Sequence, residues 1–461
     1  MTTRQGLLSR KAEALLLLLV SLIAFLGFGI AQVTAQVQQE ASPLSGLPGA
    51  WLPPAILTLS LFAIHSLLWW RGIEEEQVIL PVVGLLIAIG LIVLWRLRPP
   101  GAVWQQLTRG FIPGMLATVL LILSPTLVER VRRDWPITIS LLGLVLLLAT
   151  AFVGVMDEAG ARLALKLGPL PAIQTSEVVK LSLVVFLAWY IESEGEAAQG
   201  RAGAWGRLRL PAVRYFVPGT LFVSLATLAL VKMSDFGAIL ILGFLFITML
   251  YAGFERRIFF TVVLIGLGLS LIVGGLLAVF WEPPTIIQHR FAAFADPWSD
   301  APLLVDGLPT GITVAQGPGY QIQQAIYAIA DGGVAGTGIG QGTPENVPLA
   351  HSDFVFAAIA EEMGALGALA VLTCFAILLL RILRLAVMLP PKQVFERLLL
   401  VGIAAHFLTQ VFVMVGGTVN LLPVTGVAVP FLSQGGIALA INLTEIGLAL
   451  SLAQRLGRRP G

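Results

Sequence analysis

Long apolar runs separated by short polar segments make up most of this chain of 461 residues. A helix that crosses a bilayer needs about 20 mainly apolar residues. Runs of that kind predict an all-α polytopic membrane protein with about twelve spans. Their expected cores are residues 15 to 33, 51 to 70, 77 to 95, 111 to 128, 137 to 156, 172 to 191, 215 to 232, 236 to 252, 258 to 281, 354 to 380, 397 to 415 and 431 to 453.

Three of these runs leave alternatives open. The seventh and eighth are short and are joined by "KMSDFG", so they are expected to form either two crossings or one broken region. The first run follows Arg4, Arg10 and Lys11 and resembles the start of a signal peptide. It is longer than a typical signal-peptide core, and many spans follow it, so we expect a retained first helix.

The composition agrees with a membrane protein and excludes several other classes. Hydrophobic residues make up 57% of the chain and charged residues only 12%, whereas soluble domains are roughly a quarter charged. The net charge of +2 is spread over short clusters, which gives no indication of nucleic acid binding. Cys374 is the single cysteine, so no internal disulfide can form.

Loop charges predict how the spans are oriented. Lys and Arg accumulate on the cytoplasmic side of membrane proteins, and this bias places both termini in the cytoplasm. The exception is a predicted outer segment with Arg96, Arg98 and Arg109, which a missed or re-entrant span would explain. The long segment 282 to 353 is expected outside, where cytoplasmic ATP cannot serve it. Its "GTGIGQG" follows no buried strand, so a phosphate loop is not expected there.

Several charged residues lie inside or beside the apolar runs, where charge is costly and usually has a partner or a function. Glu177 and Lys180 are three residues apart, so they share one helical face and either form a structural ion pair or serve a function. Glu361 and Glu362 lie about two turns into the tenth run. The remaining candidates in or near the outer half are Arg162, Lys166, Asp235, His351 and Asp353.

Some of these residues also have a simpler explanation. Asp235 precedes an apolar run and could cap the next helix. His351 alone is more often an interfacial packing residue than a catalyst. The four histidines lack the nearby ligands that would suggest zinc. Together, however, the charges favour an anionic substrate held in the membrane.

Seven segments resemble the SEDS family, the cell-wall polymerases RodA, FtsW and SpoVE, and occur in the order seen in that family. The match runs from about residue 137 to 453, and the segments are "GAR", "QTSEVVK", "SDFGAILIL", "RFAAFADPWSD", "GYQIQQAIYAIADGGVAGTGIGQGT", "HSDFVFAAIAEEMGALGAL" and "LLPVTGVAVPFLSQGG".

This resemblance implies a membrane glycosyltransferase that polymerises lipid II on the outer face of the cytoplasmic membrane. It also implies a class B penicillin-binding protein as the crosslinking partner, among other elongation or division proteins. A ten-span family core would leave two extra N-terminal helices. The expected division is therefore 1–76, extra helices; 77–281, first part of the core; 282–353, extracytoplasmic catalytic loop; and 354–461, last part of the core.

The resemblance also implies roles for individual residues. Asp300 matches the family's essential aspartate and would act as the general base, while Asp296 lies four residues before it. Cations are expected to stabilise the leaving pyrophosphate, with Glu177 orienting one of them. No cofactor is required by this scheme, although a divalent cation (Mg or Mn) beside the pyrophosphate is compatible with it. The predicted substrate-binding residues are Arg162, Glu177, Lys180, Asp235, Arg290, His351 and Asp353.

The sequence departs from the family pattern at several positions. A long insertion at residues 301–318 follows Asp300. Because this insertion contains Asp306, that residue is another candidate base. The insertion could also act as a lid or contact a partner. Four single residues also differ from the pattern, namely Thr175, Ser234, Met414 and Gln434.

Two alternative functions belong to other classes. A lipid II transporter or flippase would also need a charged outer cavity, but transporters often contain paired repeats, and none is evident here. A non-catalytic scaffold of the wall-synthesis complex would explain the altered residues. It would not explain the retention of so many costly charges.

Overall fold

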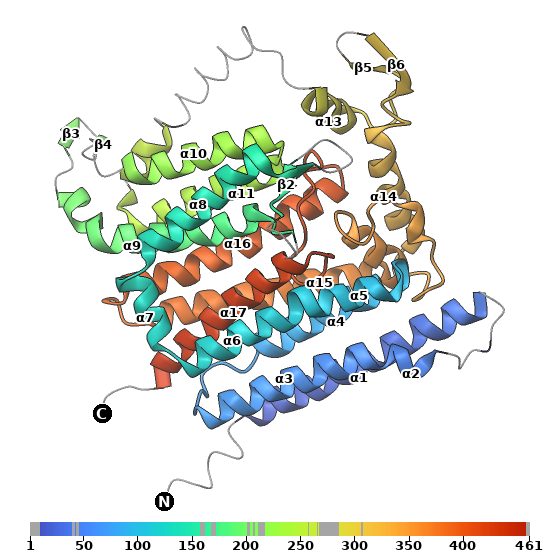
Figure 1. Ribbon diagram of the computed structural model, residues 1–461, viewed down its shortest axis with the longest axis horizontal. Coiled ribbons are helices and arrows are strands. Elements are labelled where there is room, and N and C mark those ends of the chain that lie inside the picture. The colour runs from blue at the N-terminus through green and yellow to red at the C-terminus, as the bar shows by residue number, and fades with distance from the viewer. Residues whose placement is uncertain are drawn as a thin grey trace, which may run out of the picture. The chain divides into compact units, whose positions relative to one another are not determined.

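The computed structural model describes residues 10–38, 42, 46–156, 162–166, 172–200, 203–205, 208–210, 217–256, 258–264, 266, 285–305 and 308–457. Figure 1 labels its helices and strands. The chain forms two compact units, each assembled from separate stretches. The first contains Met1–Val128, Tyr320–Leu389 and Gln410–Gly461, and the second contains Glu129–Gly319 and Pro390–Thr409. The four-part division by sequence stays a prediction.

The described part of the first unit contains helices, turns and irregular segments but no strand. Three helices pass from one unit to the other, namely α7 (Thr126–Arg133), α14 (Pro318–Gly332) and α16 (Val394–Thr418). The helices within the first unit are α1 (Lys11–Gln38), α2 (Leu47–Ala50), α3 (Leu52–Trp70), α4 (Ile79–Leu97), α5 (Pro100–Gln106), the π-helical turn η2 (Leu107–Phe111), α6 (Ile112–Leu123), the 3₁₀ turn η4 (Pro344–Asn346), α15 (Val355–Met388) and α17 (Gly436–Gly457).

Helix α4 is the most enclosed helix of the first unit. It packs against α1, α3 and α15, and nearly all its side chains are buried, whereas α1 and α3 expose leucines along one side. A helix that is apolar all round is typical of a bundle interior, and exposed leucines on a membrane helix face lipid. The two N-terminal helices therefore pack directly on the helix that follows them.

Polar side chains of α17 bond to the backbone of α6. The Ser451 hydroxyl donates to the Leu121 carbonyl at 2.9 Å, and the Gln454 amide donates to the Ile122 carbonyl at 2.8 Å. These carbonyls lie in the last turn of α6, where a helix has no partners of its own. Interhelical bonds of this kind help membrane helices associate.

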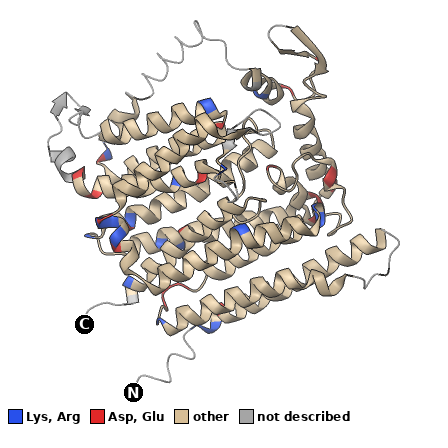
Figure 2. Cartoon of the chain, viewed as in Figure 1, with Lys and Arg blue, Asp and Glu red and all other residues tan. Residues whose placement is uncertain are grey.

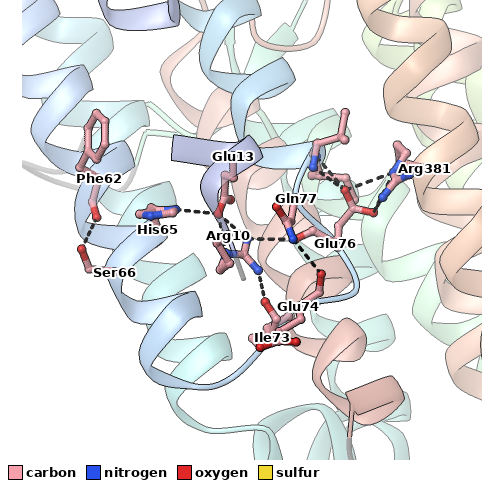
Figure 3. Close-up of polar contacts among 12 residues, drawn as sticks. Arg10, Glu13, Phe62, His65, Ser66, Ile73, Glu74, Glu76, Gln77 and Arg381 are labelled. Carbon is pink, nitrogen blue, oxygen red and sulfur yellow. Dashed lines mark hydrogen bonds and ion pairs between the residues drawn. The ribbon is translucent and has the colours of Figure 1, made fainter. Parts of the chain in front are cut away.

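A polar cluster ties the first helices to the segment between α3 and α4 (Figure 3). Buried Arg10 lies 2.5 Å from buried Glu13, whose Oε2 is also 2.7 Å from His65 Nδ1. The Arg10 guanidinium donates to the carbonyls of Ile73 and Glu76. The Glu76 carboxylate in turn pairs with Arg381 of α15 at 2.9 Å. This cluster joins three helices and the connecting segment.

Helix α15 is bent at Gly364, which has a φ of +67°. The "GTGIGQG" segment wraps this bend, because the amide of Thr337 donates to the Glu361 carbonyl at 2.9 Å and that of Gly338 to the Glu362 carbonyl at 3.0 Å. A side chain at Gly364 would meet the amide nitrogen of Gly336 at 2.3 Å. The segment therefore serves a packing role on α15 rather than forming a phosphate loop.

In the second unit, helix α9 packs against three others. The elements are α8 (Pro136–Val153), the pair β1 (Val155–Met156) and β2 (Arg162–Ala164), α9 (Thr175–Gly200), the pair β3 (Gly203–Trp205) and β4 (Leu208–Leu210), α10 (Val217–Met233), α11 (Phe236–Gly253), α13 (Thr285–Ala295), and the pair β5 (Pro302–Val305) and β6 (Leu308–Thr313). All three strand pairs are antiparallel. Helix α9 contacts α8, α10 and α11.

The structure confirms an all-α polytopic membrane protein. Nine described helices are long and apolar enough to cross a bilayer, and α10 is a shorter apolar helix. Helix α9, on the predicted run 172 to 191, is not among these nine, and the predicted run 258 to 281 lies largely outside the described residues, so the total of twelve stays a prediction. The "KMSDFG" segment is a tight turn between two separate helices, with Ser234 at a φ of +61°.

The fourth span was placed wrongly at 111 to 128. It occupies Pro100–Leu123, and only Arg98 and Pro99 separate it from α4. Gln105, Gln106 and Arg109 lower the hydropathy of its first turns, which is why the apolar run starts late. The described residues contain no missed or re-entrant span at this point.

Candidate functional site

The predicted pair on α9 is a buried ion pair. Lys180 Nζ lies 2.7 Å from Glu177 Oε1, and both residues are almost fully buried, with exposed fractions of 1% and 3%. Few charged residues lie along the helices (Figure 2). Removing one partner from such a pair leaves an uncompensated buried charge, so the two residues stabilise each other.

Asp235 joins this pair from the turn between α10 and α11. Its carboxylate accepts the Ala238 amide at 3.0 Å and so caps α11, as the simpler explanation predicted. It also hydrogen-bonds to the Ser176 side chain and interacts electrostatically with Lys180 and Glu177. Asp235 is therefore both a helix cap and a member of a buried charge cluster with Glu177 and Lys180.

The two arginines predicted for the second unit lie near elements of this cluster. Arg290 of α13 is half-buried, and its guanidinium lies 5.9 Å from the ring centroid of Phe236, the residue after Asp235. Arg162 lies in β2, which contacts α8 and α9 and pairs with β1 at Met156. The Arg162 side chain lies outside the described residues, so its direction stays a prediction.

Asp300 and Asp296 differ in their surroundings. The Asp296 carboxylate accepts the Trp298 amide at 3.0 Å and thereby holds the turn after α13. Asp300 is exposed and forms no hydrogen bond or ion pair with any described residue, the charge cluster included. Its carboxylate is thus available to a ligand. Asp306 lies outside the described residues, and the insertion itself forms the β5–β6 hairpin with exposed Leu304, Leu308 and Ile312.

His351 and Asp353 belong to the first unit, in the turn before α15. The His351 carbonyl accepts the Gln434 amide at 2.9 Å, and the Ser433 hydroxyl donates to the Ser352 carbonyl at 2.6 Å. A side chain at Gly426 would meet Asp353 Oδ2 at 3.5 Å. The turn therefore packs against the Gly- and Pro-rich segment before α17. Whether these two residues share a cavity with Asp235 stays a prediction.

Glu361 and Glu362 both accept hydrogen bonds from the loop between α14 and α15. Glu361 Oε1 accepts the Thr343 amide at 2.6 Å, and Glu362 Oε1 accepts the Gly340 amide at 3.0 Å. Arg96 lies 3.4 Å from Glu362 and 3.3 Å from Glu345. These contacts hold the loop on α15, which explains why two carboxylates lie within an apolar helix.

Some residues near these groups were not predicted. Ser176 precedes Glu177 on α9, and this position alone could have suggested that its side chain contacts the charged residues. Arg98 and Arg109 were noticed only as exceptions to the charge bias. Among the described residues, no three His, Cys, Asp or Glu side chains group closely enough to hold a metal ion. The divalent cation stays a prediction.

The model of the FtsW/RodA/SpoVE family of cell cycle proteins matches residues 76–457. The chain belongs to this family. A relative from Mycobacterium tuberculosis strain H37Rv, named peptidoglycan glycosyltransferase RodA, is 29% identical over 98% of this chain and 92% of its own length. That alignment therefore includes most of the segment before residue 76. A probable peptidoglycan glycosyltransferase FtsW from Thiomicrospira cyclica is 30% identical over 83% of this chain and 92% of its own.

Solved structures of similar proteins share the fold. The Thermus thermophilus Rod shape determining protein RodA is 25% identical, with a TM-score of 0.53 over 82% of this chain and 96% of its own. A chain from a peptidoglycan synthase complex, described as coordinating polymerization and crosslinking, is 24% identical. Its TM-score is 0.64 over 82% of this chain and 97% of its own. The fold assigned from the sequence is confirmed.

Proposed function

We propose that this chain is a peptidoglycan glycosyltransferase that polymerises lipid II on the outer face of the cytoplasmic membrane. The observation that carries the proposal is the similarity, over 98% of the chain, to a relative named peptidoglycan glycosyltransferase RodA. A polytopic membrane fold suits a substrate held in the bilayer by its polyprenyl tail. Undecaprenyl pyrophosphate is the leaving group.

Asp300 acts as the general base in this proposal. Its carboxylate takes the proton of the acceptor sugar hydroxyl as that oxygen bonds to the anomeric carbon of the donor. The bond from this carbon to the pyrophosphate oxygen breaks, and direct displacement inverts the carbon. An exposed carboxylate without a described partner supports the assignment, because a base must reach the proton that it removes.

Three cations, Arg162, Lys180 and Arg290, stabilise the negative charge that develops on the pyrophosphate. Lys180 is already paired with Glu177 at 2.7 Å, so an anion must compete with that carboxylate to reach it. Glu177 orients Lys180, and the remaining lining residues are Asp235, His351 and Asp353.

The partner in this proposal is a class B penicillin-binding protein that crosslinks the strands, within an elongation or division complex. The synthase complex that contains a similar chain is described as joining polymerization with crosslinking, which supports such a partner. The excess of Lys and Arg in the predicted inner segments supports cytoplasmic N- and C-termini.

Reconstitution with lipid II tests the function directly. Purified chain in liposomes, with and without the partner, is given labelled lipid II, and glycan strands are resolved on a gel. Strand formation is expected. If no strands form even with the partner while labelled lipid II crosses the bilayer, the chain is a transporter; if neither occurs, a scaffold role is favoured. Parallel reactions with Mg²⁺, Mn²⁺ or chelator test the divalent cation.

A further inference from the structure

Three arginines in the first unit, Arg96, Arg98 and Arg109, break the charge bias of the predicted loops. Arg96 is compensated, because it pairs with Glu362 and Glu345. Arg98 and Arg109 have no carboxylate within ion-pair distance in the part of the chain that the structure describes. Both side chains are exposed to solvent, so water and salt screen their mutual repulsion, and an anion close to both would interact with two positive charges.

A polar pocket of about 340 Å³ joins these two arginines. Its walls come from the junction of α4, α5 and η2, from the turn before α15 and from the start of α17, all within the first unit. This volume lies within the range of small-molecule sites. The residues that carry the argument are Arg98, Gln105, Arg109, His351 and Gln434.

The backbone explains why Arg109 reaches this pocket. The amide of Ile112 donates to the Leu107 carbonyl, which closes a π-helical turn around Arg109; such turns are frequent at functional sites. Next to Arg109, Gly110 packs so closely that a side chain there would lie 2.6 Å from the Gly436 carbonyl oxygen. The arginine is therefore held beside the first residue of α17.

The start of α17 adds favourable electrostatics. This helix runs for 22 residues from Gly436, and the free amides of a first helical turn attract anions. The Gly435 amide donates to Gln106 Oε1 at 3.0 Å, which fixes the approach to the helix. Both the helix terminus and the two arginines thus favour negative charge at the same place.

The lining also contains neutral groups that can form hydrogen bonds. Burial and the nearby Arg98 charge lower the pKa of His351, so its imidazole is neutral at pH 7 and can donate one hydrogen bond. The side-chain oxygen of Gln434 is buried without a hydrogen-bond partner among the described residues. Since amide oxygen and nitrogen positions are interchangeable by assignment, rotation of this amide would present a donor instead.

We infer that this pocket binds a phosphate or diphosphate group through Arg98 and Arg109. Arginine forms two parallel bonds to phosphate oxygens, which suits it to this ligand. The group can belong to the head of a membrane lipid or to a free anion, and the chemistry of recognition is the same. This site involves neither Asp300 nor the α9 charge cluster, and of the substrate-binding residues proposed above it contains only His351.

Binding measurements on the full-length purified protein test the inference with two probes. Inorganic pyrophosphate is titrated by calorimetry, and nanodiscs that contain phosphatidic acid or only phosphatidylcholine are compared by native mass spectrometry for retained lipid. Binding of pyrophosphate alone identifies a free anion as the source, and selective retention of phosphatidic acid identifies a lipid. Failure of both probes with the wild type overturns the inference.

Matched variants test whether binding requires the residues of this pocket or only positive charge on the protein. Arg109→Gln and Arg98→Gln are each expected to weaken binding at least about tenfold. Arg384→Gln, an exposed arginine of α15 outside the pocket, is expected to bind as the wild type does. Gln105→Glu replaces an exposed amide with an isosteric carboxylate and is expected to abolish binding without loss of folding. Unchanged binding in Gln105→Glu and Arg109→Gln, with normal thermal unfolding, would overturn the inference.

Discussion

Lys180 and Glu177 form a buried ion pair one turn apart on α9, with 2.7 Å between Nζ and Oε1. Asp235, at the start of α11, adds a second carboxylate that interacts with the same ammonium. The charge cluster therefore joins two helices of the second unit. The three residues can be tested separately because their contacts differ. Lys180 and Glu177 pair with each other, and Asp235 also caps α11.

Replacing Lys180 with Met should destabilise the protein by about 3–5 kcal/mol, because Glu177 would remain buried and unpaired. The double variant Glu177→Gln/Lys180→Met should recover part of this loss, since Asp235 is then the one charged member of the cluster that remains. Thermal unfolding in detergent, analysed as a double-mutant cycle, measures the difference. Lost polymerisation with an unchanged melting temperature in Lys180→Met would show a purely catalytic lysine.

The two roles of Asp235 can be separated by the choice of substitution. Asp235→Asn keeps an oxygen that can accept the Ala238 amide, so stability should fall little while activity declines with the loss of charge. Asp235→Ala removes the cap as well and should cost about a further 1 kcal/mol. Unfolding and strand formation are measured on both. Equal stability of the Ala and Asn variants would contradict a capping role.

Glu361 is expected to be structural rather than catalytic. Glu361→Ala leaves the Thr343 amide without its acceptor and should cost about 1–3 kcal/mol, while activity per folded molecule is retained. Glu345→Ala is the matched control on the same loop, because the Glu345 side chain is 52% exposed. That change should have a much smaller effect on unfolding. Abolished activity in well-folded Glu361→Ala would refute the assignment.

Glu76 and Arg381 form an ion pair. The other contacts of Glu76 predict that its loss destabilises the protein more than the loss of Arg381 does. Glu76 Oε1 also accepts the amides of Val78 and Ile79 at 2.8 and 3.0 Å, at the start of α4. Glu76→Ala should therefore destabilise the first unit by several kcal/mol, because it removes the ion pair and the acceptor of both amides. Arg381→Met should cost less, because the Glu76 carboxylate keeps its two amide donors. Chemical denaturation of the two variants gives the comparison, and equal losses would contradict it.

The lowered pKa of His351 predicts that the stability of the protein depends on pH. Its folded pKa lies below the ordinary 6.5, so the unfolded chain takes up a proton at higher pH than the folded chain does. The contribution of His351 is fully present above about pH 6.5 and is lost as pH falls toward the lower folded pKa. Melting temperatures from pH 7 to 5 should decline more steeply for the wild type than for His351→Gln. Identical slopes would contradict this origin.

The sequence predicted helices well where apolar length alone decides the structure. The run 77 to 95 became α4 at Ile79–Leu97, and 137 to 156 became α8 at Pro136–Val153. The fourth span failed because polar side chains at its start belong to a protein-lined pocket, which hydropathy counts against a membrane helix. The bend at Gly364 could not be predicted either, since it depends on contacts with Gly336 about 28 residues away.

Pairs close in sequence were easier to predict than pairs distant in sequence. The spacing of Glu177 and Lys180 placed them on one helical face, and they form an ion pair. No spacing rule joins Asp235 to this pair or to Ser176, because that contact depends on how α11 packs against α9. The family resemblance selected Asp300 over Asp296, and only the structure shows that Asp296 holds a turn through a hydrogen bond whereas Asp300 has no partner among the described residues.

The central claim is that Asp300 is the base of a lipid II polymerase, and one comparison tests it most directly. Strand formation from labelled lipid II is measured for the wild type, Asp300→Asn and Asp296→Asn, each with the partner transpeptidase. Asp296→Asn keeps the oxygen that holds its turn and should stay active. Asp300→Asn should lose at least about a hundredfold in rate while its melting temperature is unchanged. Full activity in Asp300→Asn would contradict the account.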